Sequence, residues 1–319
     1  MQENIASNRL SVAVVIATYN GAEFISEQLI SILNQNVKNI DLNIYISDDL
    51  SSDNTWGLLE EFSKKYKNIK ILKNEGNKGP ANNFINSLKF TGSEDYYLFS
   101  DQDDVWFDSK ISYLCSTAID LLEVNKPGLI YCNSEVNNKD ISLVYKKLYA
   151  NNYQHITSFD DLLFLNGGVQ GASMIINRDM KKAMLNYAGY IYMHDQLATY
   201  LAVLYGNIYY TPAVLMHYRQ HEQNVIGSNI SFKNKVKVLF KTPLLDSKSC
   251  RFISGFCDFY CHLLSKNDLD KLMFISNSSS SSIKLIFFII KNDIKLNGSR
   301  ALLLVKALFK AITRNIYQE

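Results

Sequence analysis

The N-terminal part of the chain alternates short apolar runs with stretches whose apolar residues recur at helical spacing. Residues 12–17 form a continuous apolar run rich in β-branched side chains, which is typical of a strand buried on both faces. Similar runs follow at 42–46, 69–72 and 96–99, with helical patterns between them at 24–33, 56–62 and 82–89. Strands that alternate with helices through short connections predict a parallel α/β sheet.

Polar residues gather where these strands end, which is where parallel sheets bind ligands. The fourth strand leads into Ser-Asp-Gln-Asp-Asp-Val-Trp, which places Asp101, Asp103 and Asp104 close together. Because like charges raise one another's pKa, such a cluster is costly unless a cation neutralises it. Oxygen ligands suit Mg²⁺ or Mn²⁺, which usually carries phosphates as further ligands; a solvated acidic turn is the alternative.

Four short motifs resemble, in order, those of the inverting glycosyltransferases of family 2, which have the GT-A fold. They are Ala17-Thr18-Tyr19-Asn20-Gly21, Asp48-Asp49-Leu50-Ser51-Ser52-Asp53, Asp101-Gln102-Asp103 and His194-Asp195. The string Tyr218-Arg219-Gln220-His221, with Asn224 and Gly227, resembles bacterial rhamnosyltransferases and related polysaccharide enzymes.

The resemblance covers roughly residues 10–227. It implies an α/β fold of the GT-A type, a Rossmann-like nucleotide-binding sheet with helices on both faces. We therefore expect a GT-A catalytic domain over residues 1–227 and a C-terminal, basic α-helical region over residues 228–319.

The resemblance also assigns the nucleoside-diphosphate sugar donor to residues that follow the strands. Thr18, Tyr19 and Asn20 would line the nucleotide pocket, and Asp48 would accept a hydrogen bond from the N3–H of uracil or thymine. Further donor contacts are expected from Asn77, Lys78, Gly79, Asp101, Gln102 and Arg219. A turn-forming Asp48 and a solvated Lys78 are the alternatives.

Leu50 departs from the family pattern, which usually has Gly at this position. Gly permits a positive φ. Leu50 therefore suggests either a differently shaped nucleotide loop or a turn that never needs the left-handed conformation.

For the metal, the resemblance points to Asp103, together with Asp101 and His221, as ligands of Mg²⁺ or Mn²⁺ bridging the two phosphates. An imidazole suits Mn²⁺ as a carboxylate does. For His221, a contact with the diphosphate or with the acceptor is the alternative.

The base that removes a proton from the acceptor hydroxyl is expected to be Asp195, with His194 orienting the acceptor or modulating the charge. The alternative is that this pair only caps the helix predicted over residues 196–204. Gly168 and Gly171, in a Gly-rich segment, and Trp106 are expected on the acceptor side.

Composition fits one large catalytic domain with an appendage, since 47% of the 319 residues are hydrophobic. The five cysteines are scattered without a Cys-x-x-Cys pair, which favours free thiols in a reducing cytoplasm. The first residues are polar, so no signal peptide is predicted.

The net charge of +2 hides a split between the two parts of the chain. Residues 1–230 carry 18 basic and 25 acidic side chains, and residues 231–319 carry 15 basic and 6 acidic. The basic tail ends in an amphipathic pattern, which favours attachment to an anionic membrane surface. Packing on the catalytic domain or pairing in a homodimer is the alternative, and no nucleic-acid reader motif is present.

The sequence thus predicts an inverting glycosyltransferase at the cytoplasmic face of the cell membrane. It would move a sugar, with dTDP-L-rhamnose the favoured donor and a UDP-hexose next, to a hydroxyl of a growing, lipid-linked bacterial polysaccharide. A non-catalytic nucleotide-sugar or glycan-binding module on the same fold is the alternative. A nucleotidyltransferase is disfavoured, because residues 18–23 lack a Gly-rich loop with Arg or Lys.

Overall fold

The computed structural model describes residues 9–76, 78–151, 153, 155–165, 168–221, 245–277, 282–295, 300, 301, 303, 304 and 307. Strands are β1 (Leu10–Thr18), β2 (Ile40–Asp48), β3 (Ile69–Lys73), β4 (Tyr96–Ser100), β5 (Val105–Trp106), β6 (Leu129–Asn137), β7 (Val144–Lys147), β8 (Met174–Asn177) and β9 (Ile208–Arg219). Helices are α1 (Ile25–Leu33), α2 (Thr55–Lys65), α3 (Pro80–Phe90), α4 (Lys110–Leu121), α5 (Phe159–Leu162), α6 (Arg178–Asn186), α7 (His194–Tyr205), α9 (Ser247–Tyr260), α10 (Lys266–Asn277) and α11 (Ser282–Lys291), with a 3₁₀ turn, η1, at Gly171–Ser173.

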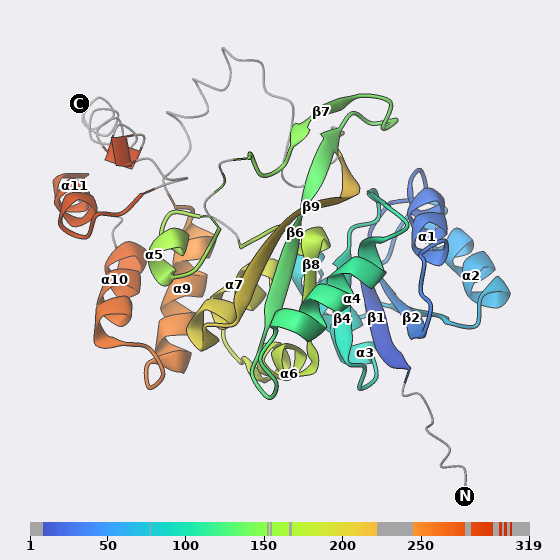
Figure 1. Ribbon diagram of the computed structural model, residues 1–319, viewed down its shortest axis with the longest axis horizontal. Helices are drawn as coiled ribbons and strands as arrows, with labels where there is room; N and C mark the ends of the chain where they lie inside the picture. The colour runs from blue at the N-terminus through green and yellow to red at the C-terminus, as the bar shows by residue number, and fades with distance from the viewer. Residues whose placement is uncertain are drawn as a thin grey trace, which may run out of the picture.

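All the strands belong to one sheet, whose order is β3-β2-β1-β4-β8-β6-β9-β5, with β7 paired to β6 (Figure 1). The strands from β3 to β4 are parallel, as the sequence predicts. Beyond β4 the sheet is mixed, because β8 runs antiparallel to both of its neighbours. The register pairs Thr18 with Asp48 and Ile16 with Ser100, so the ends of β1, β2 and β4 meet at one edge.

Helices cover both faces of the sheet because successive side chains of a buried strand point to opposite sides. In β1, Val12, Val14 and Ile16 pack into a core that also contains residues of α1, α2 and α4. Ala13 and Val15 pack into a second core with residues of α3, α6 and α7. The continuous apolar run of β1 is therefore explained by burial on both sides.

The C-terminal helices pack on the second core (Figure 1). Phe252 and Phe256 of α9 contact Tyr200 of α7, with ring centroids 5.1 and 5.3 Å apart. The described part of the basic region is helical, and it shares its core with the catalytic part of the chain. The predicted boundary between residues 227 and 228 lies outside the described residues.

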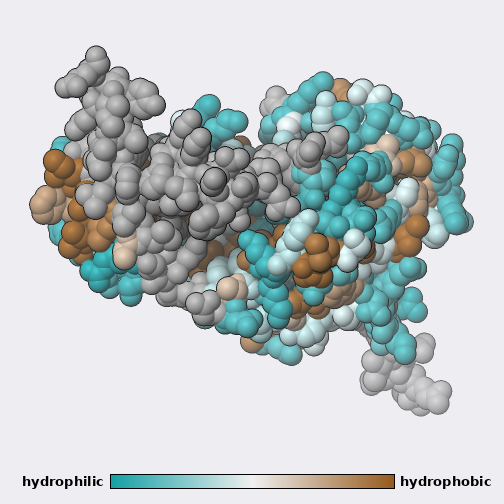
Figure 2. Space-filling model, turned by 90° about the horizontal axis from the view of Figure 1, so that it is seen from above, coloured by the Kyte–Doolittle hydropathy of each residue, from teal (hydrophilic) through white to brown (hydrophobic). Residues whose placement is uncertain are grey.

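Helix α11 presents apolar side chains on two sides. Leu285 and Ile289 are buried, whereas Ile283, Phe287 and Ile290 are 66, 70 and 50% exposed. Figure 2 shows hydrophobic surface at this end of the molecule, where Figure 1 places α10 and α11. No helix within the described residues has the length and hydropathy needed to cross a membrane.

Candidate active site

The turns after β1 and β2 hold each other through hydrogen bonds. Asp48, which is 1% exposed, accepts from the Thr18 hydroxyl and from the Ser51 backbone N–H, both at 2.9 Å. The side chain of Asn20 accepts from the Ser52 backbone N–H at 2.8 Å, and its own backbone N–H donates to Ser51 at 2.9 Å. The turn-forming role of Asp48 is therefore present in the structure, and its contact with a nucleotide base stays a prediction.

Leu50 corrects one expectation about this turn. Its φ is 60°, in the left-handed region, so the turn does need the conformation that the family's Gly permits. The Leu50 side chain is 42% exposed. A non-glycine residue in this region costs about 1–3 kcal/mol, which the surrounding hydrogen bonds offset.

Asp49 connects the end of β2 to the loop before α3. It is 7% exposed and accepts from the Asn74 amide at 2.7 Å and from the Gly79 backbone N–H at 2.8 Å. Gly79 has a φ of 103°, which explains the need for glycine at this position of the predicted donor loop. Lys78 is exposed, and Asn77 lies outside the described residues.

Gln102 joins the loop after β4 to the turn after β1. Its amide accepts from the Tyr19 backbone N–H at 2.9 Å and donates to the Tyr19 carbonyl at 3.0 Å. A Cβ atom on Gly21 would lie 2.2 Å from the Gln102 amide oxygen, so this contact requires glycine. The structure brings Tyr19 and Gln102 together as predicted donor-side residues, and it also gives Gln102 a structural role.

The carboxylates of the acidic loop interact with one another and with the predicted base. Burial, and then the charges of Asp103 and Asp195, raise the pKa of Asp101 to about 7. The Asp103 carboxylate lies 2.8 Å from His221 Nε2 and accepts a hydrogen bond when that nitrogen carries the proton. Burial raises the pKa of Asp104 well above its ordinary value, and its Oδ2 atom has no hydrogen-bond partner among the described residues.

Arg219, the last residue of β9, supports the acidic loop through hydrogen bonds of its side chain. Its Nε donates to the Asp103 carbonyl at 2.7 Å, and Nη2 donates to Glu27 of α1 at 2.5 Å. A further bond reaches the Lys139 carbonyl, and the guanidinium lies 5.0 Å from the Phe24 ring centroid. Arg219 is only 3% exposed, so the structure gives it a loop-supporting role, and its predicted donor contact stays a prediction.

The donor set at this loop fits Mg²⁺ or Mn²⁺. Burial, and then neighbouring negative charges, raise the pKa of Asp101 and Asp104, and Oδ2 of Asp104 lacks a hydrogen-bond partner among the described residues. A divalent cation would stabilise such a loop. Among the described residues, no group of three His, Cys, Asp or Glu side chains is arranged to hold a metal ion by itself. A magnesium ion usually takes only one or two carboxylates and completes its shell with phosphates and water.

Asp195 lies in the first turn of α7, one residue after the start of the helix, and Met193 is the N-cap. Its carboxylate accepts from the Gln196 backbone N–H at 2.7 Å and from the Gly171 backbone N–H. Burial raises the pKa of Asp195 to about 6 despite these hydrogen bonds. A carboxylate with this pKa is ionised at neutral pH and suited to accept a proton.

Gly168 and Gly171 pack directly against the turn that carries the predicted base. A Cβ atom on Gly168 would lie 2.2 Å from the Thr199 hydroxyl and 2.5 Å from the Asp195 carbonyl. A Cβ atom on Gly171 would lie 2.6 Å from His194 Nε2. These glycines therefore allow the backbone of their own segment to approach α7. The sequence analysis expected them on the acceptor side and did not predict this packing role.

His194 and Trp106 are more buried than their expected roles imply. His194 is 2% exposed, stacks on Phe84 with centroids 3.9 Å apart and contacts Phe99 at 4.7 Å. Burial lowers the pKa of His194 to about 3, so its ring is neutral. Trp106 is 3% exposed and belongs to a core. Their contacts with an acceptor stay predictions that this packing does not favour.

Lys110 is a site residue that sequence reasoning missed. It is fully buried at the start of α4, and its Nζ donates to the Ala172 carbonyl at 2.7 Å and to Met216 Sδ at 3.1 Å. Nζ also lies 3.8 Å from the centroid of the Trp106 ring. Burial lowers the pKa of Lys110 to about 8, although the charge of Asp104 opposes this shift. A lysine before a helical pattern resembles a solvated surface residue, so the sequence carries no signal for its burial.

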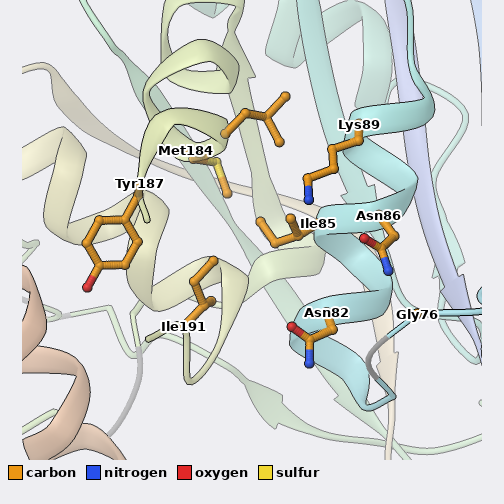
Figure 3. A pocket seen from close by; sticks show the side chains of 9 residues that line it. Gly76, Asn82, Ile85, Asn86, Lys89, Met184, Tyr187 and Ile191 are labelled. Atoms are coloured by element: carbon orange, nitrogen blue, oxygen red, sulfur yellow. The ribbon is translucent and has the colours of Figure 1, made fainter. Parts of the chain in front are cut away.

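Two cavities border the described part of the molecule. One, of about 310 Å³, lies between α3 and the end of α6 (Figure 3), and no residue predicted from the sequence lines it; its walls are Gly76, Asn82, Ile85, Asn86, Lys89, Met184, Leu185, Tyr187 and Ile191. The other, of about 680 Å³, adjoins the acidic loop through Arg219; its walls are Glu23, Phe24, Glu27, Asn138, Lys139, Asp140, Tyr145, Arg219 and Gln220. Among the residues predicted for the site, Arg219 is the one that lines this second cavity in the described part of the chain.

Comparison with known proteins adds independent findings. Residues 13–182 match the family model described as Glycosyl transferase family 2. The dTDP-rhamnosyl transferase RfbG of Shigella flexneri is 36% identical in an alignment 239 residues long that covers 70% of this chain and 78% of RfbG. The abequosyltransferase RfbV of Salmonella typhimurium is 27% identical in an alignment 253 residues long that covers 71% of this chain and 69% of RfbV.

A solved structure supports the fold assignment. The crystal structure of S. aureus TarS in complex with UDP-GlcNAc superposes with a TM-score of 0.55 and 15% identity, covering 92% of this chain and 90% of the TarS chain. The predicted GT-A architecture is thereby confirmed, with the mixed half of the sheet as a correction to the parallel arrangement.

Proposed function

The chain belongs to glycosyl transferase family 2, and we propose that it transfers L-rhamnose from dTDP-L-rhamnose to a polysaccharide hydroxyl with inversion at the anomeric carbon. The proposed donor rests on the 36% identity to the dTDP-rhamnosyl transferase RfbG, and a UDP-hexose is the next choice. The observation that carries the chemistry is that Asp195, in the first turn of α7, comes close enough to the loop after β4 for its charge, after burial and the charge of Asp103, to raise the pKa of Asp101.

In the proposed reaction Asp195 takes the proton of the acceptor hydroxyl as its oxygen attacks the anomeric carbon. The new oxygen–carbon bond forms as the bond to the diphosphate breaks, and the nucleoside diphosphate leaves with the electron pair. One displacement inverts the configuration and needs no second nucleophilic carboxylate. Asp103, Asp101 and His221 would hold Mg²⁺ or Mn²⁺, which would neutralise charge on the diphosphate.

A donor panel tests this proposal. Calorimetric titration in the presence of Mn²⁺ should rank dTDP-L-rhamnose above UDP-glucose, with GDP-mannose the weakest. Transfer is then followed with radiolabelled dTDP-L-rhamnose and a lipid extract of bacterial envelopes as acceptor. Preference for a purine nucleotide sugar would contradict the donor, and tight donor binding without any transfer would favour the non-catalytic binding module.

The proposed acceptor is lipid-linked, which puts the enzyme at the inner face of the cell membrane. Support comes from the exposed apolar side of α11, with Ile283, Phe287 and Ile290, and from the basic excess of residues 231–319. Apolar side chains flanked by lysines suit the boundary of an anionic bilayer.

Vesicle sedimentation tests this attachment. Phosphatidylglycerol vesicles should bind the protein at low salt, and Ile283→Ser combined with Phe287→Ser should release it. Ile119→Ser with Leu121→Ser, two exposed apolar residues on α4, is the matched control. A concentration-dependent dimer that the α11 variant dissociates would instead support a homodimer interface.

A further inference from the structure

Lys110 carries a charged side chain into a buried position that an apolar side chain could fill. Its side chain is 0% exposed and lies between the Trp106 ring, Met216 of β9 and the Ala172 carbonyl. Taking an ammonium out of water is costly, and an apolar side chain of similar volume often stabilises such a position equally well. Stability alone is therefore a weak explanation for a cation at this position.

The first part of that role concerns the acidic loop. The positive charge of Lys110 acts on Asp101 and Asp104, and Oδ2 of Asp104 has no hydrogen-bond partner among the described residues. Arg219 supports the same loop, but its side chain bonds to the Asp103 carbonyl and to Glu27. The charge of Lys110 thus opposes the rise in the pKa of Asp101 and Asp104 that burial and the neighbouring carboxylates cause.

The second part concerns the predicted base. Ala172, whose carbonyl accepts from Lys110, follows Gly171, whose backbone N–H bonds to the Asp195 carboxylate. A Cβ on Gly171 would lie 2.6 Å from His194 Nε2, so η1 sits directly on the first turn of α7. One ammonium therefore contacts both Trp106, two positions after Asp104 of the acidic loop, and Ala172, in the turn beside the predicted base.

We propose that Lys110 is a positioning residue for glycosyl transfer, anchoring η1 against Asp195 and fixing the acidic loop relative to it. The proposal rests on the proposed function, because it assigns Lys110 to the alignment of donor and base. A displacement of about 1 Å at a reacting group costs about 10²-fold in rate.

The decisive variant is Lys110→Met, which keeps the length of the side chain and removes the ammonium. We expect kcat to fall about 10²-fold, the donor KM to change less than about 3-fold, and the melting temperature to stay the same or rise. Lys110→Arg keeps the charge and should recover at least part of kcat. If the Met variant does not fold, Lys110→Gln replaces it.

Lys181→Met is the matched control. Lys181 makes similar contacts at the opposite end of β4, donating to Thr91 Oγ1 and the Gly92 carbonyl at 2.6 Å, with Nζ 4.9 Å from the Tyr97 ring centroid. Its removal should leave kcat unchanged. Equal losses of kcat in both variants, in proportion to lost stability, would reduce Lys110 to a structural residue and overturn the proposal.

Hydrogen–deuterium exchange measures whether Lys110 orders η1 and the first turn of α7, and it needs no assay of transfer. Backbone amides of residues 170–174 and 194–197 should exchange faster in Lys110→Met than in wild type or in Lys181→Met. Unchanged exchange together with kcat within about 3-fold of wild type would overturn the proposal. An inactive wild-type protein would refute the proposed function, while the exchange comparison would still decide whether Lys110 anchors η1.

Discussion

The loops after β1 and β2 and the loop after β4 lie at the same edge of the sheet but satisfy their carboxylates differently. Asp48 accepts hydrogen bonds from Thr18 and Ser51, and Asp49 accepts one from the predicted donor loop. These donors are neutral groups of the protein, so the two carboxylates are satisfied without an ion. Asp101 and Asp104 are instead buried near other negative charges, which raises the pKa of both. The predicted nucleotide side is thus preorganised by hydrogen bonds, whereas the acidic loop is under electrostatic repulsion that a bound cation would relieve.

The largest effect should come from removing the base that faces the acidic loop. Asp195→Asn keeps the shape of the side chain but cannot take a proton, so kcat should fall about 10²–10⁴-fold. Donor affinity, which belongs to the hydrogen-bonded side, should stay close to wild type in calorimetry. A parallel loss of donor affinity would make Asp195 a binding residue.

The second-largest effect should come from removing the cation, to which the acidic loop and the hydrogen-bonded loops should respond differently. Excess EDTA, or Asp103→Ala, should lower transfer by about 10²-fold or more, because charge on the leaving diphosphate is no longer neutralised. Asp49→Asn, on the hydrogen-bonded side, is the comparison variant and should leave the Mn²⁺ concentration for half-maximal activity unchanged. Full activity of Asp103→Ala in EDTA would refute the metal site.

The pH profile follows from the raised pKa of Asp195, which is about 6. A base must be ionised, so kcat should rise about tenfold per pH unit below pH 6 and level off above it. Steady-state rates between pH 4.5 and 8, corrected for folded protein, check this prediction. A profile that is flat across about pH 6 would place the base elsewhere.

Stability should show the opposite trend in metal-free protein. Because burial and Asp103 raise the folded-state pKa of Asp101 to about 7 from 3.8, its contribution to stability is present below pH 3.8 and lost as pH rises through 7. Melting temperatures without divalent ions should reveal this loss, and Mn²⁺ should reduce it. An identical slope with and without Mn²⁺ would contradict the cation's place beside Asp101.

A smaller effect is expected where backbone approaches the base. Gly168→Ala puts a Cβ 2.5 Å from the Asp195 carbonyl, and such overpacking costs about 1–3 kcal/mol of unfolding free energy. Gly76→Ala, where the nearest atom would be 3.5 Å away, is the control. Urea unfolding measures both.

The smallest effect tests the hydrogen-bonded side. Leu50→Gly relieves the strain of the left-handed backbone but raises the conformational entropy of the unfolded chain. The gain in the free energy of unfolding should therefore be below about 1 kcal/mol. Leu50→Ala keeps the strain and should give no gain. A large loss in the Gly variant would mean that the Leu50 side chain contributes contacts of its own.

Local pattern explains why much of the sheet and the site could be predicted from the sequence. Continuous apolar runs predicted the strands β1, β2 and β4. The polar residues that follow these runs predicted the edge of the sheet where Thr18, Asp48 and Asp101 meet. The mixed half of the sheet was missed, because β8 is a short apolar run whose direction depends on its neighbours.

The misses at the site share one physical cause. Both hydrogen-bond partners of the Lys110 ammonium are distant in sequence, 62 and 106 positions away, and Arg219 reaches Glu27 across 192 positions. Likewise, the glycines at 168 and 171 are required by a helix that follows later in the chain. Contacts of this kind leave no periodic signal in the sequence.

Arg219 has a consequence for how the protein is made. A chain leaving the ribosome exposes Glu27 and the acidic loop long before the arginine that binds both has been synthesised. A domain generally folds as a unit, and β1, β2, β4 and β9 share one sheet, so the acidic loop gains this support only after β9 has been synthesised.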